Sequence, residues 1–513
     1  MQSAVTSGTY VRRNEKSTVY VTDLLIGVIV ILVTFRGFID NFIGYGTLLV
    51  DACFAVLLIW ELYACLTGMV KRSRYAKVLR LYLAWVILCL AVGFFQVVTG
   101  KTSLYDAAIG FRNNNVYTGL FLIAALRLNR ESIRRFYRMF VNCGVFICAF
   151  AIVQYVFRGI LPDSLLVLDG EDIFTLHGSD VIRVTGLMGN TIIFGGFAIV
   201  LFSLVWAELI AKKYRPFLLW VKLAVIALAN YFTISRASVV GMAAVFVLEF
   251  VLYGCTHRRA IESIVITVIF LFLALLVVFT LFGDSVIIQR LLGQNSDWTA
   301  GSDAGHFNMI DLAVEAIGQN WLIGTLMGQS NSVVTDGTFW AYLLEMGVPV
   351  FLVYCILLFS LLLIALRNCK SKDKMTCGLS IAYIGMNAYL LVFSFINSAY
   401  AARSVLVFVW LIGGMMLAIT ARKPRTAASA AEKDCSSHSD VLPVQNCESR
   451  SERTYAPEEN VCGQQSGQIA KKTAGDEESA CGRQCELAAD RAGEREGAEK
   501  RACPADRDKG DRT

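Results

Sequence analysis

Long apolar runs separated by short polar segments dominate roughly the first 420 residues. A helix needs about 20 apolar residues to cross a bilayer, and several runs approach or exceed that length with almost no charge. They lack the polar face of a helix on a soluble protein. The pattern therefore predicts an all-α, polytopic membrane protein. We expect about twelve transmembrane helices, at residues 20–36, 43–66, 80–98, 105–126, 137–157, 188–210, 217–234, 237–254, 262–283, 338–366, 376–397 and 404–420.

The run at 338–366 is too long for one straight span. It contains the segment "MGVPV", Met346 to Val350. A proline inside a helix removes a backbone hydrogen bond and disfavours helical geometry in the residue before it. We expect this segment to divide the run into a short outer helix and a true span.

The spacing of Lys and Arg predicts the orientation. Cytoplasmic loops of membrane proteins carry an excess of these residues, and here every second loop is basic while the others are not. The basic N-terminus argues for a cytoplasmic start. An even number of spans then puts both termini in the cytoplasm, with the chain in the plasma (inner) membrane. We expect a cytoplasmic N-terminus at 1–19, a membrane domain at 20–420 and a disordered cytoplasmic tail at 421–513, which is too poor in apolar residues to fold.

Two loops on the expected outer side are substantial, at about 158–187 and, between spans nine and ten, about 284–337. The second contains "SDAGHFNMIDLAVEAIGQ", which we expect to form a helix on the outer membrane surface or over the mouth of the bundle, with Ser302 or Asp303 as its cap. Its apolar positions share one face and its polar positions the other: Phe307, Ile310, Val314 and Ile317, against Asn308, Asp311 and Glu315.

Composition narrows the function classes. The chain of 513 residues is 56% hydrophobic. Its inner loops leave no room for a folded cytosolic domain, and neither a nucleotide-binding nor a zinc-protease motif occurs. We expect no metal, no cofactor and no nucleic-acid partner. Function must therefore lie in the membrane or on its outer face.

Ionisable residues near membrane depth are costly and tend to line functional cavities. We interpret Arg36, Lys101 and Arg158 as interfacial anchors. Arg236 stands in "TISRASVVG", a gap between two spans that is too short for a loop. Arginines that converge on one point can bind phosphate, because the guanidinium donates two parallel hydrogen bonds. Separate contacts with lipid headgroups explain the same pattern. The other ionisable residues expected on this side include Arg112, Arg183, Arg290, His306, Asp336, Glu345 and Arg403.

Two motifs carry a family resemblance. "RVTGLMGNTIIFGGF" precedes one span, and "LANYFTISRASVVGMAAVF" follows two spans later. With the large loop, and with "NWLIGTLMGQSNS" leading to "LLEMG" in the next helix, this order resembles the O-antigen ligase and Wzy-type polysaccharide polymerase superfamily over roughly residues 20–420.

The resemblance implies a nucleotide-independent glycosyltransferase on the outer face of the membrane. It implies a surface polysaccharide polymerase that moves undecaprenyl-diphosphate-linked glycan repeats to a hydroxyl of an acceptor glycan. Implied partners are this donor, the acceptor, membrane lipids, and flippase or chain-length regulator proteins. By carry-over, Arg183 and Arg236 contact the diphosphate and His306 acts as general base, a capping or surface role being its alternative. Expected to bind the substrate are Arg112, Arg290, Asp336, Glu345 and Arg403.

One departure favours a polymerase over a ligase. Ligases of the superfamily carry a His-Asn pair before the helix that follows the large loop, and this chain has Thr335-Asp336-Gly337 there. Asp336 and Glu345 are alternative bases, or groups that orient the sugar. Readings outside the family are a twelve-span transporter or flippase of lipid-linked or anionic solutes, and a sensor or scaffold that acts through the tail.

Overall fold

The computed structural model describes residues 20–67, 74–166, 183–211, 216–257, parts of 261–280, 296–325, 327–328, 337–395, 400 and 402–421. All structural statements below concern these ranges. The expected N-terminal segment and tail, the residues Arg290 and Asp336, and most of the expected span at 262–283 lie outside them.

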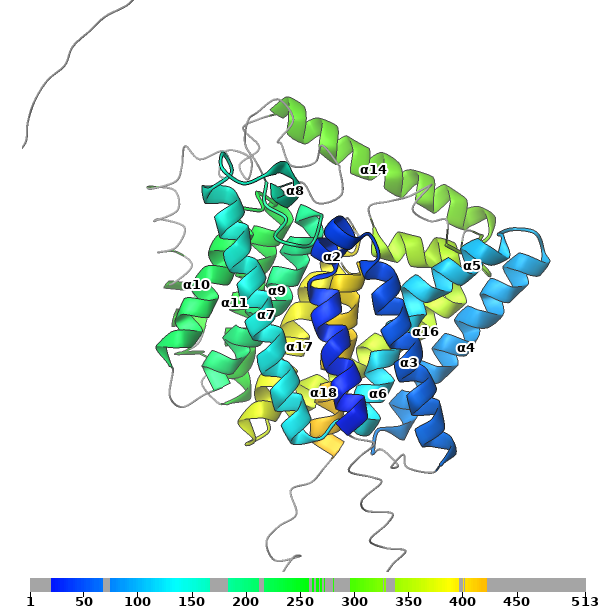
Figure 1. The fold of residues 1–513 in the computed structure, drawn as a ribbon, viewed down its shortest axis with the longest axis horizontal. Helices are drawn as coiled ribbons and strands as arrows, with labels where there is room; N and C mark the ends of the chain where they lie inside the picture. The colour runs from blue at the N-terminus through cyan, green and yellow to red at the C-terminus, as the bar shows by residue number, and fades with distance from the viewer. Residues whose placement is uncertain are drawn as a thin grey trace, which may run out of the picture. The chain divides into compact units, whose positions relative to one another are not determined.

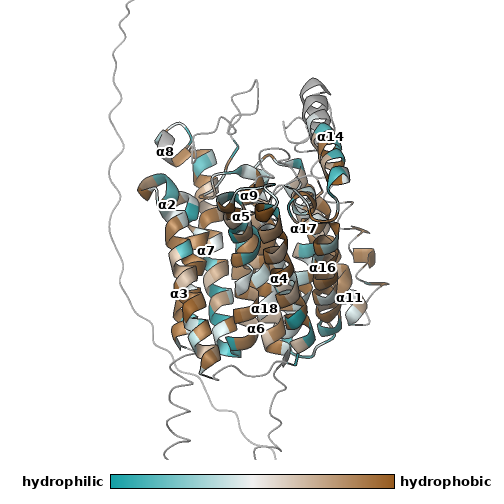
Figure 2. Cartoon of the chain, turned by 90° about the vertical axis from the view of Figure 1, so that its right-hand side faces the viewer, coloured by the Kyte–Doolittle hydropathy of each residue, from teal (hydrophilic) through white to brown (hydrophobic). Residues whose placement is uncertain are grey.

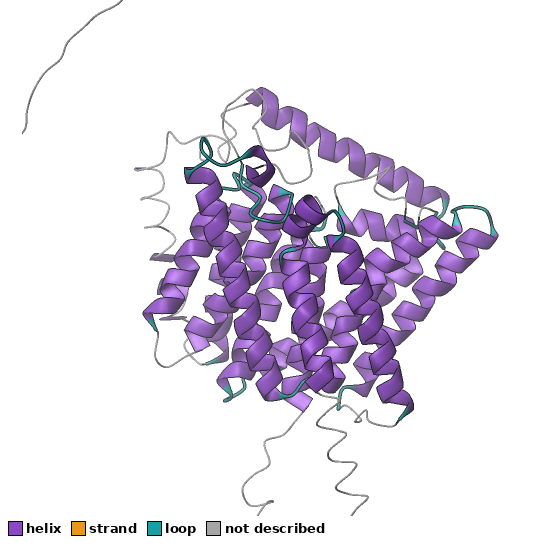
Figure 3. Cartoon of the chain, in the orientation of Figure 1, coloured by secondary structure: helices purple, strands orange, loops and turns teal. Residues whose placement is uncertain are grey.

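The described chain is helical and contains no strand, as the all-α prediction requires (Figure 3). Eight described helices are long and apolar enough to cross a membrane, and a bent pair, Tyr20–Thr34 and Arg36–Ile43 (α2), makes up a ninth candidate. A polytopic membrane protein is thus confirmed, while the count of about twelve remains a prediction. The eight are α3 (Gly46–Leu66), α4 (Ala76–Val98), α7 (Arg130–Val156), α9 (Thr191–Ala211), α11 (Arg236–Thr256), α16 (Thr338–Asn368), α17 (Lys374–Phe393) and α18 (Arg403–Ala421).

Most residues along the helices are hydrophobic, and hydrophilic residues are more frequent towards the ends of the bundle (Figure 2). Helices α9 and α18 are its centre: 83% and 89% of their apolar windows are buried, against 28% for α3 and α4. A helix that is apolar all round belongs in such a core. Trp85 of α4 stacks on Trp410 of α18 at 5.8 Å between ring centroids, which joins the centre to the flank.

Two expected spans differ from the prediction. The run at 105–126 is not one helix but three pieces: α5 (Leu104–Phe111), a π-helix η1 (Arg112–Val116) and α6 (Gly119–Arg127). The run at 217–234 gives a shorter helix, α10 (Phe217–Tyr231). It ends early because the Thr233 hydroxyl donates to the Asn230 carbonyl at 2.6 Å and closes a turn there.

The expected break in the long run at 338–366 is confirmed. Within α16, Gly347 has φ 75° and ψ 168°, and Pro349 follows. The conformation is open only to glycine without strain. Two backbone hydrogen bonds join the kinked part of α16 to the segment at 321–325. Val348 N donates to Trp321 O and Thr325 N donates to Leu344 O, both at 2.8 Å.

The helix expected in the large loop exists as α14 (Ser296–Gln319), lying across one end of the bundle (Figure 1). It begins before Ser302 and Asp303, so neither residue caps it. The expected apolar face is also only half right. Ala313 is fully buried against Leu344 and Trp340, whereas Phe307 and Val314 are 67% and 52% exposed. The small side chain of Ala313 lets α14 approach α16 closely, so the side of α14 that carries Ala313 is the buried one.

The two ends of the bundle differ. Arg130, the first residue of α7, pairs with Asp373, the cap of α17, so both helices begin at the same end. Since the helices alternate in direction, α9, α11 and α18 begin at the other end, where α2, α8 (Asp163–Leu166) and α14 lie (Figure 1). We call the latter the arginine end, because it holds Arg36, Arg112, Arg183, Arg236 and Arg403.

Candidate functional site at the arginine end

The π-helix Arg112–Val116 sets the geometry of this end. Its sequence, "RNNNV", places three amides in succession where a regular helix would bury apolar side chains. Such π-helical insertions are rare and recur at functional sites. Asn113 accepts hydrogen bonds from Arg112 (Nη2 at 3.3 Å) and from Nη2 of Arg403 at 3.0 Å. One amide oxygen thus holds two guanidinium groups from different helices.

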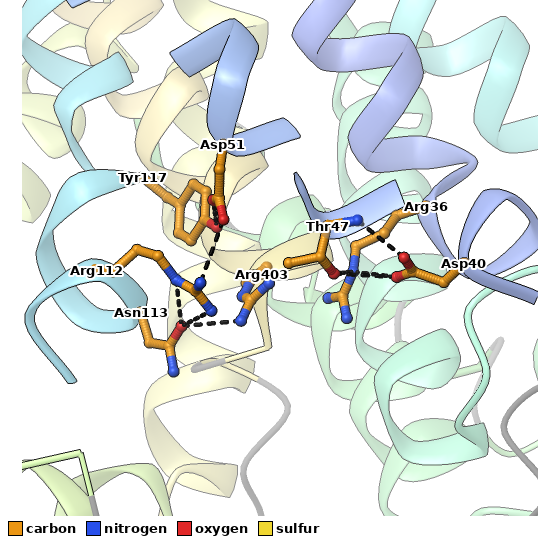
Figure 4. A network of polar contacts seen from close by, with 8 residues as sticks. All are labelled: Arg36, Asp40, Thr47, Asp51, Arg112, Asn113, Tyr117 and Arg403. Atoms are coloured by element: carbon orange, nitrogen blue, oxygen red, sulfur yellow. Dashed lines mark hydrogen bonds and ion pairs between the residues drawn. The ribbon is translucent and has the colours of Figure 1, made fainter. Parts of the chain in front are cut away.

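Asp51 and Tyr117 complete the surroundings of these arginines (Figure 4). Nη1 of Arg112 lies 3.2 Å from Oδ2 of Asp51, and the Tyr117 hydroxyl donates to the other oxygen of that carboxylate. The Arg403 guanidinium stacks over the Tyr117 ring, 5.5 Å from its centroid. Helix α3 therefore supplies the counter-charge for α18 and the π-helix.

Arg36 extends the group from the opposite flank. Its Nε donates to Oδ2 of Asp40 and to Oγ1 of Thr47, each at 3.0 Å, and Thr47 N donates to Oδ1 of Asp40 at 2.8 Å. Figure 4 shows the guanidinium of Arg403 between those of Arg112 and Arg36. We call Arg36, Arg112 and Arg403 the arginine cluster. Its described counter-ions are the two carboxylates of Asp40 and Asp51.

The cluster has unused hydrogen-bonding capacity. Nη1 of Arg403 is buried and has no hydrogen-bond partner among the described residues. Arg36 and Arg112 keep 34% and 33% of their side chains exposed. A guanidinium that is desolvated without a partner is costly, and an anion would relieve that cost.

Arg183 and Arg236 form a second arrangement, around the turn of "TISRAS". Nε of Arg183 donates to Thr233 O at 3.1 Å, and Val184 N donates to Phe232 O at 3.2 Å. The two motifs of the sequence are therefore bound directly to each other. Ile234, the residue that follows Thr233 in this turn, has φ 52°. A β-branched residue with positive φ is strained, and such strain concentrates at functional sites.

The start of α11 follows from this turn. Ser235 caps the helix by accepting from Ser238 N, and Arg236 is its first residue. Gly195 of α9 packs there: a Cβ on it would lie 2.7 Å from Cβ of Ser238. Two helix N-termini, which carry partial positive charge, thus lie close together beside Arg236.

Helix α2 connects the two arrangements. A Cβ on Gly37, next to Arg36, would lie 2.3 Å from the Leu187 carbonyl oxygen. Leu187 belongs to the "RVTGLMGN" segment that begins at Arg183. The arginine cluster and the Arg183–Arg236 turn are therefore successive parts of one surface at this end.

Glu345 contacts the π-helix next to the cluster. It is only 5% exposed, and Nδ2 of Asn114, the neighbour of Asn113, donates to its carboxylate. Its backbone carbonyl accepts from Nε2 of Gln96 at 2.8 Å, and Gln96 also donates to Ile323 O at 2.7 Å. This burial fits a carboxylate that supports the π-helix better than one that meets a substrate.

Sequence reasoning placed several residues here and missed others. Arg112, Arg183, Arg236 and Arg403 all lie at this end, as does Glu345. Arg36, which we expect to be an interfacial anchor, also belongs to the cluster. Asp51, Asn113 and Tyr117 were not considered, although the amide run in an otherwise apolar segment was a signal. The backbone of His306 lies within α14, but its side chain, like Arg290 and Asp336, is outside the described structure.

The described residues hold no group of three or more His, Cys, Asp or Glu side chains that could ligate a metal. Comparison with protein-family models and with curated proteins finds no match to this chain.

Proposed function

We propose that this protein is a glycosyltransferase of the cell envelope, a polysaccharide polymerase that uses glycan repeats carried on undecaprenyl diphosphate. The resemblance of its motifs to the O-antigen ligase and Wzy-type polymerase superfamily suggests the class. The observation that supports it best is the arginine cluster, where three guanidinium groups converge with the Arg183–Arg236 turn beside them.

The chemistry fits what such groups can do. The acceptor hydroxyl forms a bond to the anomeric carbon, the bond from that carbon to the diphosphate breaks, and the hydroxyl proton passes to a base. Negative charge grows on the leaving oxygens. Preorganised cations in a dry site stabilise that charge, and each is typically worth about 100-fold or more in rate. In this proposal Arg183, Arg236 and the cluster bind diphosphate, and His306 is the candidate base.

The test uses purified protein in vesicles with a lipid-linked repeat as donor. Arg236→Ala and Arg403→Ala should each lower polymer formation by about 100-fold. Arg158→Ala is the matched control, because Arg158 is exposed at the same end and, among the described residues, its guanidinium lies over the ring of Tyr155, at 5.7 Å. Variants that insert normally and still make full-length polymer would disprove the proposal.

The product distinguishes the alternatives. A polymerase gives a ladder of repeats, and a ligase of the same superfamily gives a single addition to its acceptor. A transporter or flippase gives neither, but moves the donor across the vesicle membrane. Accumulated single repeats in cells that lack the protein would agree with the polymerase.

A further inference from the structure

A cavity of about 720 Å³ opens at the opposite end of the bundle from the arginine cluster. It lies between α7, α9, α10 and the start of α17. Six basic side chains line it: Arg130, Arg134, Arg138, Lys222, Lys372 and Lys374. The proposed polymerase activity gives this cavity no role.

The acidic side chains that line the cavity, Asp373 and Glu208, already accept hydrogen bonds from neighbouring side chains. Asp373 caps α17, accepts from Oγ1 of Thr376 at 2.6 Å and pairs with Arg130. Burial raises the pKa of Asp373, but the hydrogen bonds of Thr376 and Arg130 outweigh it and leave that pKa below its usual value, so the carboxylate stays ionised. Glu208 accepts from the Tyr137 hydroxyl at 2.5 Å.

Most of the basic side chains of the cavity have no carboxylate partner among the described residues. Lys222 donates to Oδ1 of Asn142 at 2.7 Å, a neutral partner. Of the ion pairs found among the described residues, only Arg130–Asp373 belongs to the cavity. The cavity therefore carries a strong positive charge from four further cations, Arg134, Arg138, Lys372 and Lys374. Such a concave, positively charged site attracts a multiply charged anion.

The walls are apolar. Val141, Leu204, Leu219 and Leu379 line the cavity and are buried. On the α10 side, Leu218 lines it and is 62% exposed. Helix α10 also presents Trp220 and Val221, which are 44% and 38% exposed. In a membrane protein these exposed apolar side chains meet acyl chains, so the cavity borders the lipid.

We infer that this cavity binds the headgroup of an anionic glycerophospholipid, with the phosphate among Arg134, Arg138, Lys372 and Lys374 and the acyl chains against α10. A free phosphate ion would use the cations but not the apolar wall. The basic loops predict that this end faces the cytoplasm, and anionic lipids gather in that leaflet and bind basic pockets between spans. The inference does not depend on the proposed function.

The test measures lipid retention by native mass spectrometry of the whole protein in detergent, with phosphatidylglycerol or phosphatidylcholine added. The wild type should retain phosphatidylglycerol about tenfold better than phosphatidylcholine. Arg134→Gln with Arg138→Gln should abolish that preference. The matched control is Lys77→Gln with Arg80→Gln, two exposed cations near the start of α4 at the same end, outside the cavity.

Three results would overturn the inference. One is equal retention of the two lipids by the wild type. Another is an unchanged preference in the Arg134/Arg138 variant, with size-exclusion profiles showing that it is folded. The third is displacement of phosphatidylglycerol by millimolar inorganic phosphate, which would make this a site for a free anion. Loss of polymerase activity has no bearing on any of them.

Discussion

Asn113 shows how one side chain organises a charged site. It has no charge itself, yet its amide oxygen accepts from both Arg112 and Arg403. Because a neutral acceptor orients two cations without neutralising them, the positive field stays available to a ligand. An aspartate in the same place would orient them equally well and remove one charge.

Asn113→Asp tests this distinction. The substitution keeps shape and acceptor geometry but adds a negative charge within hydrogen-bond distance of two guanidiniums, so the donor should bind about tenfold more weakly, seen as a raised KM. Asn129→Asp is the control: Asn129 caps α7 at the opposite end, and aspartate caps a helix as well as asparagine does. An unchanged KM in the first variant would show that the cluster does not meet the donor.

Asp373 predicts a pH dependence of stability. Its pKa in the folded protein lies below the ordinary value of 3.8, because hydrogen bonds from Thr376 and Arg130 outweigh the effect of partial burial. A group with a depressed folded pKa stabilises the fold above its unfolded pKa, and the contribution is lost as pH falls through the folded pKa.

The thermal midpoint of the wild type should therefore exceed that of Asp373→Asn at pH 7, and the difference should shrink below about pH 4. Asparagine is also a good N-cap, so the comparison isolates the charge. Thermal unfolding in detergent across this pH range measures it. A difference that stays constant down to acid pH would contradict the assignment.

At the scale of elements, helix positions followed from the length of the apolar runs, because a run of about 20 residues has few other solutions in a bilayer. The break in α16 followed from Gly347 and Pro349. The division of the run at 105–126 did not follow, since a run of amides signals polar contacts but not a π-helix, whose geometry depends on what Asn113 and Asn114 contact across the bundle. The buried face of α14 was missed for a similar reason: contact with α16 selects Ala313 over the larger Phe307 and Val314.

Gly347→Ala measures how far the break in α16 constrains the fold. A Cβ there would lie 2.6 Å from Leu322 O at a backbone φ of 75°, so the variant should lose roughly 1–3 kcal/mol of stability. Gly318→Ala in α14 is the control, because a Cβ there meets nothing within 4 Å. Thermal unfolding of both variants gives the comparison. Equal midpoints would mean that the segment at Leu322 can shift aside without cost.

At the scale of the molecule, the two ends carry positive charge in different ways. At the arginine end, Asp40, Asp51 and Asn113 accept hydrogen bonds from the guanidinium groups of the cluster. At the opposite end, most of the cations that line the cavity have no carboxylate partner among the described residues. The second pattern is the one that the positive-inside rule associates with the cytoplasm. The candidate site could be predicted from sequence only as a list of arginines; their arrangement around Asn113 comes from packing.

Cysteine labelling tests this orientation. In a background that lacks the 15 native cysteines, a cysteine at Lys101 or Arg158 should react with a membrane-impermeant maleimide in intact cells. A cysteine at Lys77 or Lys372 should react only after permeabilisation, because these residues lie at the other end of their helices. The reverse pattern would place the arginine cluster in the cytoplasm and remove the basis for an extracellular donor.

The π-helix has a further consequence, which concerns helical phase. One residue more per turn rotates everything that follows by about 100° relative to a regular α-helix. The extra residue lets Asn113 and Asn114 meet two arginines and Glu345 while α6, beyond it, still packs against α18. A chain shortened by one residue at Asn115 would keep every side chain of the cluster and lose their directions. Loss of a single codon in this segment should be tolerated far less well than substitution at the same place.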